Sequence, residues 1–419
     1  MAVEITTLEN GLRIATDTMP DAESVVVGAW VGVGTRHEKA KANGVAHLVE
    51  HMMFKGTKKR SAYELSAAIE NKGGSVNAYT TREETAYYAR VLPEETANAV
   101  DIIADMLRHS VFDAGELDRE RQVIIQEIGR SLDTPEDYAD DLFYECALPG
   151  QKIGRPVLGS AKIIASLPRA EITGYVASHY NAANMVVVAA GKIAHADFVA
   201  LAKKHFATLP RGKKPAVDKA RVSGGESRHD KDIEQVHIYM GFGGPHAHAQ
   251  ARYPAQILSA ILGGGAASRL FQEVREKRGL VYTIYTSHAA FSDAGLFQVY
   301  AGTDPERLRE FIPVVCRELR AVTRKITHDE LARAKSQLRA DILMGRESVM
   351  RRAEMLGHQM LAFGKPSRTE RVLQKIDAVT GDDVRALAAT MFARPPVLAA
   401  LGPLARLESY DKIRARLTL

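Results

Sequence analysis

An internal repeat with a period of about 211 residues is the feature that most constrains how this 419-residue chain can fold. Residues 25–32 form an apolar, β-branched run typical of a buried strand, and residues 236–243 repeat its character. Residues 180–191 and 392–402 form a second matching pair near the end of each half. Halves that carry the same succession of elements are expected to fold as two homologous domains.

Helical patterns lie between these strands. Asp113 with Glu116, and Thr327 with Glu330, have the spacing of an N-cap residue and its capping-box partner. Strands that alternate with long helices predict an α+β fold made of two tandem α/β domains. We expect these domains at 1–210 and 233–419, joined by an exposed, charged linker at 211–232, with further helices at 97–109, 327–345 and 347–363.

His47, Glu50 and His51 form an H-x-x-E-H motif in the first half. On an α-helix, residues i and i+4 share one face about 6 Å apart, so both imidazoles can reach one metal ion. Glu50 lies beside that face, where it can take a proton from a metal-bound water without being a ligand. This order is the inverted zincin signature. The alternative is an ordinary pair of histidines on an amphipathic helix, so a third ligand must decide.

The helix expected after Asp113 offers two candidates for that ligand. Glu120 and Glu127 are seven residues apart, so two helical turns place both carboxylates on one stripe. Glu127 could bind the metal, and Glu120 could orient a histidine ligand from behind. Spacing alone does not distinguish this arrangement from two solvated helix carboxylates.

Together, the pentapeptide at 47–51 and Glu127 within the run 119–128 resemble the pitrilysin/insulinase zinc peptidases, nearest to the mitochondrial processing peptidase β-subunit and its bacterial relatives. The resemblance covers nearly the whole chain. It implies zinc on His47, His51 and Glu127, with Glu50 as general base and Glu120 supporting the site. It also implies that each domain is a mixed sheet with helices packed on one side.

Arg275 and Tyr282 in the second half resemble a further pair of that family. The resemblance implies that both reach over the zinc to hold the substrate carbonyl and the developing oxyanion. Without it, an exposed helix cation and a packed strand tyrosine would be the simpler interpretation. Residues 259–263 occupy the repeat position of the zinc motif and hold no zinc ligand, so one Zn²⁺ per chain is expected.

The large single-chain members of the family place the zinc and the Arg/Tyr pair in different domains out of four. This leads to the hypothesis that the present chain is half of a clamshell, a homodimer or a heterodimer with a related chain. In that dimer, Arg275 and Tyr282 of one subunit would complete the zinc site of the other.

Residues 73–81 alternate in character after a Gly-Gly turn and predict a strand. As an edge strand it could accept an extended peptide through main-chain hydrogen bonds. The resemblance places it beside the zinc, with Asn77 and Ala78 at the contact. A plain hairpin strand is the equal alternative.

Composition gives no support to several other classes of protein. Lys and Arg exceed Asp and Glu by 56 − 51 = 5, and the pI is near 9.0, a mild and diffuse basicity that does not argue for nucleic acid. The chain has two cysteines, Cys146 and Cys316, so we expect no disulfide framework. Neither a signal peptide nor an apolar run of about 20 residues is evident, so we expect no membrane insertion and a cytoplasmic location.

The sequence therefore predicts a zinc endopeptidase that hydrolyses unfolded peptides or presequences in an enclosed chamber. The competing function is a non-catalytic or partner-dependent subunit of a heterodimeric processing peptidase or a core-protein-like complex. Because this chain keeps both the metal motif and the Arg/Tyr pair, activity is favoured.

Overall fold

A computed structural model describes residues 3–418, which form two compact units. Unit 1 contains the chain up to Arg130, together with Arg155–Asp218 and Met344–Ser367. Unit 2 contains Ser131–Gly154, Lys219–Leu343 and the chain from Arg368 onward. The units therefore differ from the two halves of the sequence, because each includes one segment from the opposite half.

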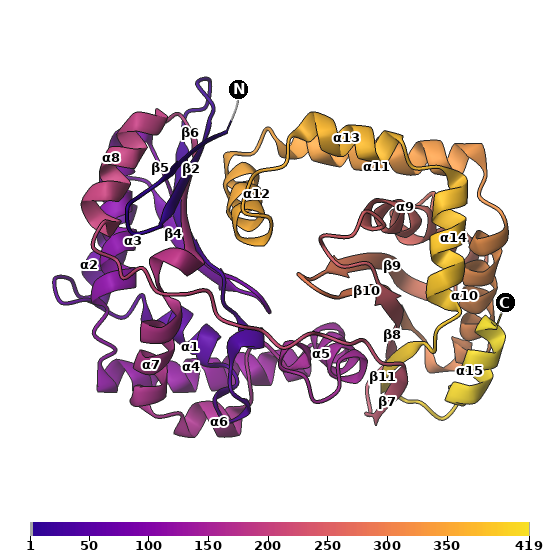
Figure 1. The fold of residues 1–419 in the computed structure, drawn as a ribbon. Helices are drawn as coiled ribbons and strands as arrows, with labels where there is room; N and C mark the ends of the chain where they lie inside the picture. Colours follow the sequence, from indigo (N-terminus) through magenta and orange to yellow (C-terminus); the bar gives the residue numbers. More distant parts are fainter. Residues whose placement is uncertain (1–2, 419) are drawn as a thin grey trace. The chain divides into compact units, whose positions relative to one another are not determined.

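Unit 1 is built on a mixed six-stranded sheet (Figure 1). The order of its strands is β1-β2-β6-β3-β5-β4. The pair β2 and β6 is parallel, whereas the other neighbours are antiparallel. Since β4 stands last in this order, one of its sides is a free edge. The strands are β1 (Glu4–Thr7), β2 (Arg13–Thr18), β3 (Val25–Val31), β4 (Ser75–Thr80), β5 (Thr85–Val91) and β6 (Met185–Gly191).

Strand β3 shows how both faces of this sheet are covered. Val25, Val27 and Ala29 point into the main core of unit 1, which the helices of the first half build. Val26 and Trp30 point to the other face. The helices that begin in the first half and belong wholly or mainly to unit 1 are α1 (Val45–Met52), α2 (Ala62–Glu70), α3 (Thr96–His109), α4 (Ala114–Asp133), α6 (Ala161–Ser166), α7 (Arg169–His179) and α8 (His195–Phe206).

Helix α12 (Val349–Ala362), which belongs to the second half of the sequence, covers that other face (Figure 1). Gly357 lies directly on the indole of Trp30, at a distance that leaves no room for a side chain. Arg352 anchors the helix by donating from Nε to Asp17 Oδ2 at 2.6 Å. The sheet of unit 1 is thus packed on both faces, and the outer helix comes from the second half of the sequence.

Unit 2 repeats this plan around a five-stranded sheet in the order β7-β11-β8-β10-β9. Helix α5 (Pro135–Ala147), from the first half, covers its outer face, where Phe143 packs on Tyr239. The strands are β7 (Gly225–Asp230), β8 (Val236–Gly244), β9 (Val281–Ala290), β10 (Gly295–Thr303) and β11 (Val397–Gly402). The remaining helices are α9 (Arg252–Gly263), α10 (Leu308–Arg324), α11 (His328–Gly345), α13 (Thr369–Asp377), α14 (Gly381–Phe392) and α15 (Tyr410–Leu417).

The predicted fold class is confirmed, since β3 and β8 take equivalent interior positions in the two sheets, as do their neighbours β6 and β11. Two features differ from expectation. Part of the segment expected as an exposed linker forms strand β7, which pairs in parallel with β11. In addition, each sheet carries a helix on the face that was expected to be bare.

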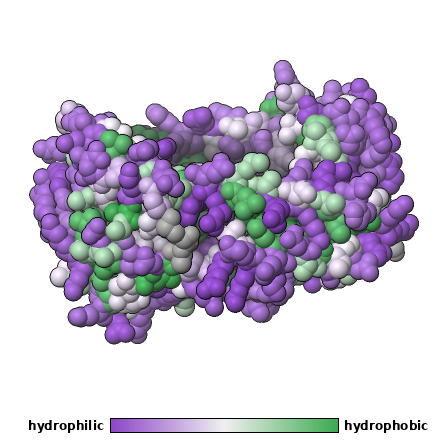
Figure 2. Space-filling view, turned by 90° about the horizontal axis from the view of Figure 1, so that it is seen from above, coloured by the Kyte–Doolittle hydropathy of each residue, from purple (hydrophilic) through white to green (hydrophobic). Residues whose placement is uncertain are grey.

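Hydrophilic side chains cover most of the face shown in Figure 2. Within residues 3–418, the search for a helix both long and apolar enough to cross a membrane finds none.

Candidate metal centre

Helix α1 carries the H-x-x-E-H motif, and a buried carboxylate fixes its start. Glu38 is 1% exposed, and it accepts hydrogen bonds from the backbone N–H of Gly44 and of Ala46, each at 2.8 Å. The side chain of Asn43 donates a third bond at 2.8 Å. Burial raises the pKa of Glu38 to about 7, although these donors oppose the shift. The first turn of α1 is therefore held to the loop before it.

The apolar side of α1 packs into the core, which orients its polar side. Leu48, Val49 and Met52 are fully buried. Because residues four apart share a helix face, the same orientation aims His47 and His51 together toward α4. Their ring centroids lie 4.6 Å apart.

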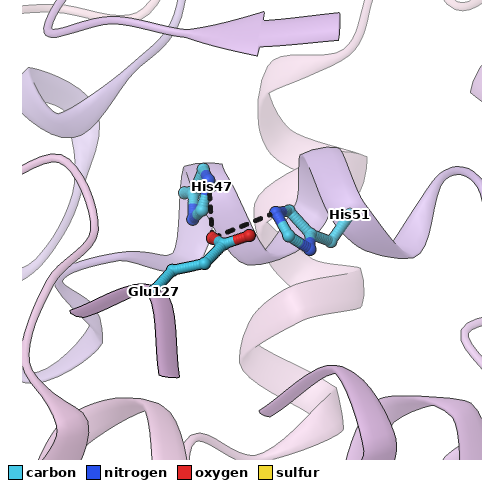
Figure 3. A group of neighbouring side chains, drawn as sticks. All are labelled: His47, His51 and Glu127. Atoms are coloured by element: carbon cyan, nitrogen blue, oxygen red, sulfur yellow. Dashed lines mark ion pairs between the residues drawn. The ribbon is translucent and has the colours of Figure 1, made fainter. Parts of the chain in front are cut away.

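Glu127 of α4 meets both histidines (Figure 3). Its Oε2 lies 3.8 Å from Nε2 of His47 and 3.6 Å from Nε2 of His51. The ligand atoms of the three residues all lie within 4.8 Å of one another. Tetrahedral ligands about 2.1 Å from one ion are themselves separated by roughly 3.4 Å, so the group needs only a small contraction to bind zinc.

Protonation and hydrogen bonding also suit a metal. Burial, reinforced by the charge of His51, lowers the pKa of His47 to about 3, which keeps the imidazole neutral as a ligand must be. Nδ1 of His47 is buried and has no hydrogen-bond partner among residues 3–418. Two imidazoles and one carboxylate are the donor set of many catalytic zinc sites. The residues therefore fit the metal that the sequence predicts.

Glu120 lies behind His51 rather than among the ligands. Its Oε2 is 3.0 Å from Nδ1 of His51, and its Oε1 is 2.7 Å from Nζ of Lys55. Burial lowers the pKa of His51, but the hydrogen bond to Glu120 and the charges of Glu127 and Glu50 outweigh it and raise that pKa overall. A carboxylate on Nδ1 leaves Nε2 free for a metal and fixes the ring orientation.

Glu50 has a partner that the sequence did not reveal. The hydroxyl of Thr80, on β4, donates to Oε2 of Glu50 at 2.5 Å. Burial raises the pKa of Glu50, whereas the hydrogen bond from Thr80 lowers it. The only available signal was the position of Thr80 two residues after Ala78, on the same side of the predicted strand.

Asn77 and Ala78 both lie on β4, the edge strand that also carries Thr80. Asn77 pairs with Tyr88 and Ala78 with Tyr87 on one side of the strand, and the other side is the sheet edge. Asn77 is exposed, and its Oδ1 accepts from the N–H of Ala78. Helix α1 packs directly on this strand, so the edge lies close to the motif.

Arg275 and Tyr282 lie together in unit 2. Arg275 belongs to a π-helical turn, Phe271–Glu276, and Tyr282 to β9. The guanidinium carbon of Arg275 is 4.6 Å from the ring centroid of Phe271 and 5.5 Å from that of Tyr282. Tyr282 is 76% exposed, which excludes the packed-strand interpretation.

These features define a metallopeptidase of the inverted H-x-x-E-H class, built on a duplicated mixed-sheet fold. Residues 13–161 match the family model described as insulinase (peptidase family M16). Residues 166–338 match the model described as the peptidase M16 inactive domain. The chain belongs to the insulinase family, peptidase family M16, as its resemblance to that family predicted.

Relatives cover nearly the full length. An uncharacterized zinc protease of Rickettsia felis is 37% identical over 400 residues, 95% of this chain and 97% of that protein. One of Mycobacterium tuberculosis is 38% identical over 410 residues, 96% of this chain and 94% of that protein. An uncharacterized zinc protease of Bacillus subtilis is 34% identical over 399 residues, 95% of this chain and 97% of that protein.

Solved structures share the fold at lower identity. A chain in complex III of Candida albicans superposes with a TM-score of 0.89 at 22% identity and covers 100% of both chains. A protease from Helicobacter pylori superposes with a TM-score of 0.86 at 22% identity, covering 96% of this chain and 99% of that one.

Proposed function

We propose that this protein is a zinc-dependent endopeptidase acting on unfolded peptides, with Glu50 as its general base. The observation that carries the proposal is the meeting of His47, His51 and Glu127 beside Glu50 and an open sheet edge. Relatives named zinc proteases support the choice of metal.

Each residue of the proposed active site has its own role. His47, His51 and Glu127 would hold zinc, which when bound acts as a Lewis acid on the scissile carbonyl and lowers the pKa of water. Glu50 accepts the proton of the attacking water and passes it to the leaving amine. Thr80 holds the Glu50 carboxylate, and Glu120 fixes the tautomer of His51.

Substrate would bind as an added strand on β4. An extended peptide there pairs with main-chain groups around Asn77 and Ala78, so affinity would depend little on its sequence. Only an unfolded segment can offer a free strand. Unfolded peptides and presequences are therefore the substrates we propose, in a chamber closed by a second subunit.

The Arg/Tyr pair supports a dimer in which catalysis is shared. Arg275 and Tyr282 sit in the half without the metal motif, and the ring of Tyr282 stands exposed. We propose that they bind the substrate carbonyl in the zinc site of the partner subunit, whether a copy of this chain or a related one. We place the enzyme in the cytoplasm, with one zinc per chain.

Cleavage of a quenched fluorescent peptide by the zinc-loaded protein tests the activity. Glu50→Gln should abolish cleavage while zinc, quantified by metal analysis, stays bound. Chelation should remove activity, and added zinc should restore it. Zinc-loaded protein whose cleavage is absent or independent of Glu50 would favour the alternative, a non-catalytic subunit.

A mixing experiment tests sharing between subunits. Glu50→Gln protein and Tyr282→Phe protein are each expected to be inactive. After subunit exchange, one site of each mixed dimer regains all its groups, so activity should rise. Activity of the mixture no higher than that of either variant alone would show that the pair does not act in trans.

A further inference from the structure

Far along the chain from the metal motif, a cavity of about 500 Å³ lies in unit 2 against α10 and α15, and it is lined by basic residues. We call it the α10 basic pocket. It is lined by Pro313, Cys316, Arg317, Arg320, Ala321, Arg324, Lys325 and Arg416. Five of these eight residues are cations and none is acidic.

Helical spacing produces the concentration of charge. Arg317, Arg320 and Arg324 recur at intervals of three and four residues on α10, which aligns them on one stripe. Like charges so placed repel one another. Arg416 adds a fourth guanidinium from α15, and Lys325 adds an ammonium just after the end of α10.

Nearby carboxylates neutralise only part of this charge. Arg416 is paired with Glu408, with Nε 2.6 Å from the carboxylate. Arg317 is paired with Glu318 at 3.0 Å and also reaches Glu273 at 3.4 Å. Carboxylates of the protein itself therefore neutralise these two guanidinium groups.

Arg320, Arg324 and Lys325 form no ion pair among residues 3–418, and Nε of Arg320 is buried without any hydrogen-bond partner. The negative end of a helix attracts cations only within its last turn, which offsets part of the repulsion between Arg324 and Lys325 but gives neither of them a counter-ion. Arg320 lies a full turn earlier, so the helix end does not explain it. Burying part of an unpaired guanidinium is unfavourable unless an anion meets it.

We propose that the α10 basic pocket binds an oligophosphate group, either free or as part of a nucleotide. The planar fork of arginine matches a phosphoryl group with two parallel hydrogen bonds, and several unpaired cations call for more than one phosphoryl group. The volume is that of a small-molecule site, for which about 300–1,000 Å³ is typical.

Calorimetric titration of the full-length protein with inorganic tripolyphosphate tests the proposal. Wild-type protein should bind it saturably at fixed ionic strength, and the double variant Arg320→Gln, Arg324→Gln should bind at least about tenfold more weakly. Arg371→Gln is the matched control, since it removes an exposed cation from α13 outside the pocket. Its affinity should equal that of wild type.

Several outcomes would overturn the proposal: no saturable binding by wild type, unchanged affinity in the double variant, or equal losses in the control. Tripolyphosphate also chelates zinc, so metal-free protein is titrated in parallel, and binding that needs the metal counts against the pocket. ATP is the second probe: affinity similar to or tighter than that of tripolyphosphate shows that the group is accepted as part of a nucleotide, and weaker affinity shows that it is bound free. Binding of ATP without binding of tripolyphosphate would show recognition of the nucleoside and would contradict the proposal. If the double variant is misfolded by circular dichroism, Lys325→Gln replaces it.

Discussion

Replacing Thr80 by valine should separate the chemical step from substrate binding. Valine has nearly the shape of threonine but cannot donate the 2.5 Å hydrogen bond to Glu50. The hydroxyl of Thr85 lies 3.5 Å from that of Thr80 and donates to the carbonyl of Val33. It is therefore already engaged and cannot substitute for Thr80.

The size of the effect follows from the type of bond that is lost. A hydrogen bond to a charged group contributes about 1.5–3 kcal/mol. Each 1.36 kcal/mol corresponds to about a tenfold change in rate, so kcat should fall about ten- to a hundredfold. KM should change little, because the main-chain edge of β4 remains intact.

The pH profile should move in a defined direction. Burial raises the pKa of Glu50, and the hydrogen bond from Thr80 lowers it. A general base works as the carboxylate, so activity is lost as the pH falls through its pKa. Without the donor that pKa rises further, and the acidic limb of the kcat profile of Thr80→Val should lie at higher pH than that of wild type.

Steady-state kinetics of zinc-loaded wild type, Thr80→Val and Thr80→Ser on one peptide, over a range of pH, give the comparison. Serine keeps the hydroxyl and should restore most of kcat. Ser75→Ala, at the exposed start of the same strand, controls for a general change in β4. An unchanged kcat in Thr80→Val, or a loss that comes only from a higher KM, would refute the role assigned to Thr80.

Three further substitutions test the fold and the metal centre. Gly357→Ala places a Cβ about 2.4 Å from the Trp30 ring, so it should lower the free energy of unfolding in urea by about 1–3 kcal/mol. Gly174→Ala is the control: its Cβ meets open space on α7, and it should not lower that free energy. Glu38→Ala leaves two buried N–H groups at the start of α1 unpaired, each costing about 1–3 kcal/mol. The free energy of unfolding in the same assay should therefore fall by more than about 2 kcal/mol, and a smaller fall would contradict the anchoring role of Glu38. Glu120→Gln should weaken zinc affinity about 10- to 100-fold in competition with a chelator, and unchanged affinity would remove Glu120 from the support of His51.

Features encoded by local periodicity were the ones that the sequence could predict. Strand β3 and its repeat β8 are continuous apolar runs, because both of their faces are buried. His47 and His51 could be paired from helical spacing, and the family resemblance selected Glu127 as the third ligand. Within residues 3–418, the group of side chains placed so that it could hold a metal ion consists of these three residues.

Features that depend on distant segments left no local signal. The run that forms β7 is polar and charged, and it becomes a strand only because β11 offers it a parallel partner. Thr80 meets Glu50 only because β4 packs on α1, and Glu38 is buried only because its loop folds back over the start of that helix. Likewise, no pattern in the sequence of α12 or in that of the strand that carries Trp30 predicts that the two pack together.

The position of α12 has a consequence for synthesis of the chain on the ribosome. When residue 218 has emerged, every strand of the first sheet exists, yet Val26, Trp30 and Val188 have no cover until Leu356 and Met360 are made. Contacts between residues so far apart in the sequence form slowly. Until α12 has been made and packs on it, the exposed apolar face of the sheet is prone to aggregation. We therefore expect that the first half does not fold on its own, and that when expressed alone it needs residues 344–367, supplied as a separate peptide, to become soluble and cooperative in its unfolding.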